Sequence, residues 1–160
     1  MAAPAPIPRI APDGFRLDDG YQTLITFGVL PGLDIWEKEA QPPGIDGGDP
    51  IDTTTMHNDS YRTNAARKLK SLTEHTIVAA YDPCAYVDLL TMVNVVDEIT
   101  VFFPDNSTLS YWGFIRSVEF SPLVEGEQPE MTITVVPTNY DACNCVEAGP
   151  VIDCNGTCTC

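Results

Sequence analysis

The stretch EITVFFPDNSTLSYWGFIRSVEF, residues Glu98–Phe120, carries the clearest structural signal in the sequence. Both of its arms are rich in β-branched and aromatic residues, which favour strands. The segment between them, PDNST at 104–108, combines residues that favour chain reversal. The stretch therefore predicts an antiparallel hairpin. A further strand is predicted in MTITVV, where Met131, Ile133 and Val135 share one parity and threonines occupy the other.

The flanking segments also indicate strands. YQTLITFGV, residues 21–29, alternates with a period of two, the LPG turn follows, and LDIWEKEA, residues 33–40, is expected to be the returning strand. In LTEHTIVAAY the residues His75, Ile77, Ala79 and Tyr81 share one parity, so His75 is expected to be a core or interface histidine rather than a catalytic one.

One helix is expected, over residues 83–93. Asp82 is a favourable N-cap and Pro83 suits the first helical position. An apolar stripe follows at helical spacing, formed by Tyr86, Leu89, Leu90 and Val93. The fold class is thus mainly β (α+β): an antiparallel β-sandwich or barrel-like pair of sheets with one flanking helix. Three regions follow from this: an extended proline-rich arm over 1–20, a β domain over 21–140 and a cysteine-rich extension over 141–160.

Residues 41–70 contain prolines, glycines and a run of threonines, and they predict a long loop of the kind that is commonly functional. Asp46, Asp49 and Asp52 recur at intervals of three, but this spacing differs from that of a calcium loop, so solvated turn carboxylates are favoured over a metal site. His57, with Asp59 and Ser60 nearby, has no context that supports catalysis.

Charge excludes some partners. The chain has 23 acidic and 8 basic residues and a formal net charge of −15, which disfavours binding to nucleic acid or to anionic membranes. No apolar run is long enough to span a membrane, and the proline-rich start does not resemble a signal peptide. The one basic cluster is RKLK, with Arg67, Lys68 and Lys70. It is expected to meet an acidic patch on a neighbouring copy.

Five of the six cysteines lie in the last eighteen residues, namely Cys143, Cys145, Cys154, Cys158 and Cys160. Their spacing lacks the paired C-x2-C units of a strong zinc site. Disulfides within or between chains, a thiolate metal site and free thiols in a mobile tail all remain open, with disulfides favoured over the metal site.

Taken together, PPGIDGGDPIDTTT at 42–55, the strand–YDP–helix junction around Tyr81–Pro83, and GFIRSVEFSPLVEGEQPEMTITVVPTN at 113–139 resemble a tail tube (major tail) protein of a long-tailed bacteriophage. The resemblance covers roughly residues 21–139 and excludes the cysteine-rich end. It implies a structural virion protein with no catalytic residues and no cofactor, assembled in the host cytoplasm into hexameric rings that stack as the tail tube.

The resemblance further implies particular partners. They are further copies of the chain and other tail proteins, namely the tape measure, tail terminator and distal tail proteins. DNA passes through the lumen without specific binding, and no membrane is involved. The expected contacts between subunits are made by Asp49, Asp52, Arg62, Arg67, Lys68 and Lys70. The alternative function is a small surface binding module stapled by disulfides or a metal, and a metal-dependent enzyme using the terminal thiols is a third possibility.

Overall fold

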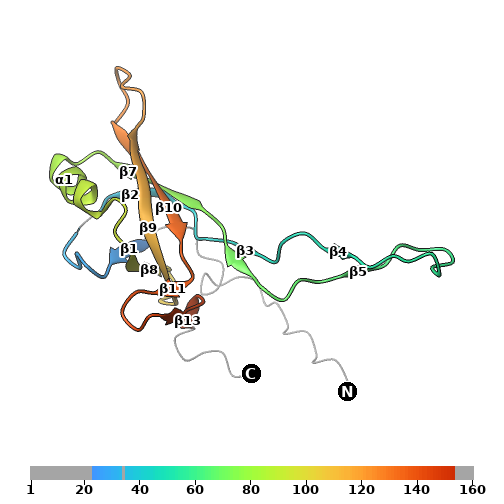
Figure 1. Ribbon diagram of the computed structural model, residues 1–160. Helices are drawn as coiled ribbons and strands as arrows, with labels where there is room; N and C mark the ends of the chain where they lie inside the picture. Colours follow the sequence, from blue (N-terminus) through green and yellow to red (C-terminus); the bar gives the residue numbers. More distant parts are fainter. Residues whose placement is uncertain (1–22, 34, 154–160) are drawn as a thin grey trace, which may run out of the picture.

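The protein is built around one antiparallel sheet, seen in a computed structural model that describes residues 23–33 and 35–153 (Figure 1). The strands of this sheet lie in the order β1 (Leu24–Phe27), β8 (Asp97–Phe102), β9 (Thr108–Phe120), β10 (Glu130–Pro137), β7 (His75–Ala80) and β2 (Glu37–Ala40), and β13 (Val151–Asp153) also pairs with β9. The predicted fold class, mainly β with antiparallel strands and a single flanking helix, is confirmed.

The long strand β9 organises the sheet. Its first half pairs with β8, from Thr108 opposite Phe102 to Gly113 opposite Asp97, so the predicted hairpin is confirmed. Its second half pairs with β10. In the turn between β8 and β9, the Asp105 carboxylate accepts hydrogen bonds from the backbone N–H and the hydroxyl of Ser107. These bonds fix the chain reversal that the sequence predicted.

The core lies on one face of this sheet because apolar side chains alternate with polar ones along each strand. Met131, Ile133 and Val135 of β10 are fully buried, as the sequence predicted. The other largest fully buried side chains are Ile25, Phe27, Ile77, Leu89, Ile99, Val101, Tyr111 and Ile115. These residues come from β1, β7, β8, β9 and α1, so the core joins distant parts of the chain.

The strands β1 and β2 do not form the hairpin that the sequence indicated. β1 pairs with β8 and β2 pairs with β7, at opposite ends of the strand order. A side chain links the two strands: the carboxylate of Glu37 accepts a hydrogen bond of 2.8 Å from the backbone N–H of Ile25. In the described part of the chain the sheet is therefore curled but not closed by a backbone ladder.

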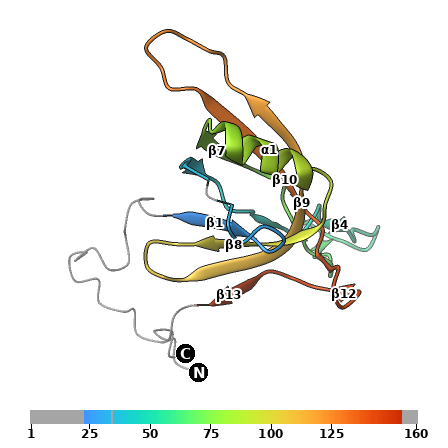
Figure 2. The ribbon, with the colours of Figure 1, turned by 90° about the vertical axis from the view of Figure 1, so that its left-hand side faces the viewer.

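The helix α1 (Pro83–Met92) lies against the sheet (Figure 2) and begins as predicted. The Asp82 carboxylate accepts a hydrogen bond of 2.9 Å from the N–H of Cys84. The buried face is formed by Ala85, Leu89 and Met92, whereas Leu90 is exposed. Tyr86 and Val93 also pack against the core, so the predicted stripe is confirmed except at Leu90. Ala85 was missed because a small side chain gives a weak apolar signal.

Residues 41–74 form a projecting two-stranded ribbon in place of the expected irregular loop (Figure 1). Near the sheet, β3 (Ile45–Asp46) pairs with β6 (Ser71–Leu72). Further out, β4 (Ile51–Asp52) pairs with β5 (Asn64–Ala65). We call residues 41–74 the arm, as distinct from the N-terminal arm expected over 1–20. Sequence periodicity could not reveal it, because beyond Leu72 at its base neither face of the arm is buried.

The chain after residue 139 also differs from expectation. β11 (Tyr140–Asp141) and β12 (Val146–Glu147) form a small hairpin. The chain then returns to the main sheet, where β13 pairs with the start of β9, with Val151 opposite Ser110. The start of the cysteine-rich extension is thus part of the sheet rather than a separate appendage.

Candidate assembly surfaces

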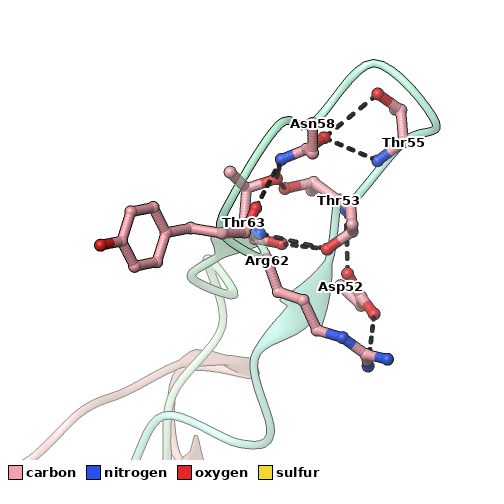
Figure 3. Close-up of polar contacts among 8 residues, drawn as sticks. Asp52, Thr53, Thr55, Asn58, Arg62 and Thr63 are labelled. Carbon is pink, nitrogen blue, oxygen red and sulfur yellow. Dashed lines mark hydrogen bonds and ion pairs between the residues drawn. The ribbon is translucent and has the colours of Figure 1, made fainter.

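The tip of the arm is held by its own polar side chains (Figure 3). Asn58 accepts a hydrogen bond from the backbone N–H of Thr55 and donates one to the carbonyl of Tyr61, each at 2.9 Å. Thr53 and Thr63 are bonded across the ribbon: the Thr53 N–H donates to the Thr63 carbonyl, and the two hydroxyl groups are also hydrogen-bonded. The tip therefore has a defined shape although it has no core.

The arm exposes large apolar side chains along its whole length. Met56 at the tip is fully exposed, Tyr61 is 85% exposed and Leu69 is 81% exposed. Ile45 and Ile51 are also exposed. An isolated two-stranded ribbon is marginally stable in water, and contiguous exposed apolar groups commonly mark contact surfaces. The arm is therefore a candidate intermolecular surface.

Several of the predicted contact residues bond within the arm. Arg62 lies 4.0 Å from the Asp52 carboxylate across the ribbon, and both side chains are largely exposed. Two hydrogen bonds lower the pKa of the Asp52 carboxyl. The larger effect comes from the Thr54 side chain and the smaller from the Thr54 backbone N–H. Arg67 donates from Nε to the Asp49 carbonyl at 2.7 Å. These four residues order the arm, which leaves their predicted contacts between subunits as a proposal.

Lys68 and Lys70 lie at the base of the arm, where they form part of the wall of a groove of about 360 Å³. One wall comes from the arm and includes Leu69, and the other comes from residues 147–150 between β12 and β13. We call this the lysine groove. Neither lysine forms an ion pair with any described residue. The sequence could not reveal the groove, because its walls are far apart in the chain.

The face of the sheet opposite the core is rich in hydroxyl groups. Thr26, Thr100 and Ser110 lie in one cross-strand row, with 2.9 Å between the Thr100 and Ser110 hydroxyl oxygens. Thr76, Thr134 and Ser117 form a second row. We call this surface the hydroxyl face. Its carboxylates include those of Glu39, Glu98, Glu119, Glu130 and Asp153.

Outside the arm, the structure describes two positively charged side chains, Lys38 and Arg116, and each is paired with a carboxylate. Lys38 lies 2.7 Å from a carboxylate oxygen of Glu130. Arg116 binds both oxygens of Glu74 from one guanidinium nitrogen, each at 2.9 Å. In the described residues every other Lys or Arg belongs to the arm. The sheet surface therefore offers no free positive charge to an anionic polymer.

The two histidines have different environments. His75 is buried, and its Nε2 lies 2.7 Å from the Tyr111 hydroxyl. Burial lowers the pKa of His75 to about 4, against smaller opposing effects of the Thr73 backbone and the Glu74 charge. His75 is thus a core histidine, as predicted. His57 is exposed at the arm tip.

The cysteines near the end of the described chain are exposed. Cys143 and Cys145 lie in the turn between β11 and β12 and carry free thiols, as does Cys84 on α1. The Asp141 carboxylate accepts hydrogen bonds from the backbone N–H of Cys143 and from the Asn144 amide, which shape this turn. Cys154, Cys158 and Cys160, which the sequence singled out for disulfides, lie outside the described residues.

Within residues 23–33 and 35–153, no group of three or more His, Cys, Asp or Glu side chains is placed to hold a metal ion. No helix in this part of the chain is long and apolar enough to cross a membrane. The surfaces that stand out are therefore the arm, the lysine groove, the hydroxyl face and the terminal strands β1 and β2.

The comparisons with known proteins identify the fold. No protein-family model matches the chain, and no curated protein matches its sequence. A chain of the virion of a native gene transfer agent particle has a similar fold, with a TM-score of 0.61, 11% identity, and coverage of 86% of this chain and 99% of that one. A chain of the anti-feeding prophage baseplate, determined with 6-fold symmetry, gives a TM-score of 0.57, 8% identity and coverage of 81% and 89%. The chain thus has a fold that occurs in a virion and in a prophage baseplate.

Proposed function

We propose that the chain is the tail tube subunit of a long-tailed bacteriophage, which assembles into stacked hexameric rings that conduct DNA during ejection. It acts in the virion tail, together with the tape measure, tail terminator and distal tail proteins. Its role is structural, with no catalytic step. The 6-fold symmetry of the baseplate in which a similar chain occurs supports a ring of six.

The arm is the observation that carries this proposal. It projects from the sheet and leaves Met56, Tyr61 and Leu69 without packing partners in the described chain. Docking on another subunit buries these side chains, and each contributes about 1.5–3 kcal/mol when fully removed from water. In the proposed tube the arm of one subunit lies on a subunit of the adjacent ring.

The terminal strands of the sheet support ring closure. β1 and β2 each have one edge without a strand partner among the described residues. Unpaired strand edges are templates for pairing with another chain, and a closed ring removes them from solvent. The Ile25 N–H on this edge of β1 is already bonded to the Glu37 carboxylate, so side-by-side packing of copies satisfies the remaining backbone groups of the two edges.

The hydroxyl face is suited to line the lumen of this tube. It carries hydroxyls and the carboxylates of Glu98 and Glu119, while the cations Lys38 and Arg116 are paired. A surface of this kind repels the DNA phosphates and forms no lasting ion pairs with them. DNA therefore slides along such a lumen without specific binding.

The direct test is electron microscopy of the concentrated full-length protein, with rings or tubes as the expected result. The matched variant lacks residues 47–70 and joins Asp46 to Ser71 through Asn-Gly. This junction suits a two-residue hairpin loop, because Asp46 and Ser71 are paired across the ribbon. We expect this variant to keep the circular dichroism and unfolding transition of the full chain, because the deleted residues are exposed, but to form no tubes.

Two results would count against the proposal. A full-length protein that remains monomeric at every concentration and salt condition tested contradicts it. Tubes formed equally well by the variant without residues 47–70 contradict the role assigned to the arm. Folding of the variant is checked first, so that loss of assembly is not confused with loss of structure.

A further inference from the structure

The turn between β9 and β10, residues 121–129, projects from one end of the sheet (Figure 2). Its apolar side chains Leu123 and Val124 are 78% and 53% exposed. Glu125 and Glu127 follow at once and form no ion pair with the described residues. We call this segment the acidic turn. It presents two apolar side chains beside two unpaired carboxylates.

The backbone gives the acidic turn a defined shape. The N–H of Glu127 donates to the carbonyl of Val124 at 3.2 Å, and Gly126 has a φ of +87°. A positive φ at the third position of a hydrogen-bonded turn favours glycine. At the base of the turn, the Ser121 N–H donates to the Glu130 carbonyl at 3.0 Å. The turn is therefore a preformed projection, which lowers the entropy lost on docking.

The lysine groove has the complementary character. Its walls include the apolar side chains of Ile45, Leu69 and Pro150, together with the unpaired cations Lys68 and Lys70. Glu147 also lies in the wall, so the groove carries one more positive than negative charge at neutral pH. A ligand with an apolar tip and adjacent carboxylates fits both properties of this groove.

The acidic turn and the lysine groove lie beyond opposite ends of β10. The turn ends just before Glu130, whereas the groove is lined by Asn139, just after Pro137, and by Leu72, just before His75, which is opposite Val135. Since β10 has 8 residues, its ends lie about 23 Å apart. The turn therefore cannot enter the groove of its own chain. Two copies stacked head to tail bring one turn to the other copy's groove.

We propose that the acidic turn of one subunit inserts into the lysine groove of a subunit in the next ring. This inference rests on the proposed tube and names the contact that stacks its rings. Leu123 and Val124 pack against the apolar walls, while Glu125 and Glu127 pair with Lys68 and Lys70. The contact is heterologous, because the two surfaces differ, so it repeats without limit along an axis as a tube requires.

The test uses two full-length charge-reversal variants. The groove variant carries Lys68→Glu and Lys70→Glu, and the turn variant carries Glu125→Lys and Glu127→Lys. Like charges then face each other in each variant alone. We expect the fraction of protein that sediments as tubes to fall by on the order of tenfold or more in each, because such juxtapositions cost several kcal/mol. Single rings should persist, because the ring contacts are unchanged.

Mixing the two variants provides the decisive measurement. The unmodified turn of the groove variant fits the unmodified groove of the turn variant, and the two reversed surfaces also match each other. An equal mixture should therefore recover tubes seen by electron microscopy, with the two chains in equal amounts. The control is a mixture of the groove variant with a groove variant that also carries Asp88→Lys on α1. It should recover no tubes, because neither chain has an unmodified groove.

The outcomes separate this inference from the proposed function. If the unmodified chain forms tubes but either reversal leaves them intact, the contact is not made by these residues. If both reversals abolish tubes and the mixture does not restore them, the pairing of turn with groove is wrong. If the unmodified chain forms no tubes at all, the proposed function itself fails.

Discussion

The carboxylate of Glu37 in β2 accepts a hydrogen bond of 2.8 Å from the backbone N–H of Ile25 in β1. This bond joins the two terminal strands of the sheet, which share no backbone ladder. It satisfies a partly buried amide that the strand order leaves without a partner. The Glu37 side chain therefore links the two ends of a curled sheet.

Replacement of Glu37 should open this junction. Glu37→Ala leaves the Ile25 N–H without its acceptor, and we expect the free energy of unfolding to fall by about 2 kcal/mol. Glu37→Gln keeps an acceptor oxygen and should cost less than about 1 kcal/mol. Urea unfolding of the three proteins measures the difference. Equal losses in both variants would show that the hydrogen bond is not the cause.

Gly28 is expected to tolerate no side chain. A Cβ at this position would lie 2.8 Å from Oδ1 of Asp97, a buried carboxylate held by the N–H groups of Val29 and Glu98. Gly28→Ala should therefore destabilise the fold by about 1–3 kcal/mol, measured by urea unfolding. Gly32→Ala is the matched control, because nothing lies within 4 Å of its Cβ position. A similar loss in the control would contradict the steric explanation.

His75 should make the fold sensitive to acid. Its pKa is about 4 in the folded protein, because burial disfavours the charged ring, against about 6.5 in the unfolded chain. The unfolded chain thus binds the proton more tightly. The contribution of His75 to stability is complete above pH 6.5 and declines as the pH falls towards 4, by at most about 3 kcal/mol.

The measurement compares unfolding of the wild-type chain and His75→Gln between pH 4 and pH 7.5. Carboxylates titrate in both proteins, so the difference between their pH profiles isolates His75. We expect the variant to be less stable at neutral pH and the gap to narrow with acidification. Parallel profiles would show that His75 has a similar pKa in both states.

The cysteine-rich end is proposed to link neighbouring subunits through Cys143, Cys145, Cys154, Cys158 and Cys160. Cys143 and Cys145 are exposed in a turn and available for such bonds. Assembled particles run on non-reducing gels should give a ladder of multimers, and Cys143→Ser with Cys145→Ser should weaken it. Cys84→Ser, at the exposed cysteine on α1, is the control and should leave the ladder unchanged. Monomer bands alone would contradict links between chains.

The sequence predicted those parts of the fold whose signals are local and strong. The β8–β9 hairpin has β-formers around a turn of favourable residues, β10 alternates strictly, and α1 begins at an N-cap followed by proline. The pairing of β1 and β2 was predicted wrongly, because it depends on contacts with distant strands. Short distance along the chain favoured a hairpin, but the core places β8 beside β1 and β7 beside β2.

The candidate surfaces were only partly predictable. The RKLK cluster indicated an interaction site, and two of its members, Lys68 and Lys70, line the lysine groove. The opposite wall of this groove, residues 147–150, has no sequence signal, because its position follows from the pairing of β13 with β9. The sequence predicted a loop where the arm forms a ribbon. Most side chains of the arm face solvent on both sides, so no periodic pattern marks its strands.

The length of β10 has a consequence for the dimensions of the particle. The acidic turn lies beyond one end of this strand, and the lysine groove lies beyond the other. In the proposed stack, part of the axial repeat is therefore set within each subunit by a single extended strand, which acts as a ruler of about 23 Å. Backbone hydrogen bonds to β7 and β9 make this ruler stiff. The tube can then bend only at the joints between rings, while the pitch of each ring stays constant.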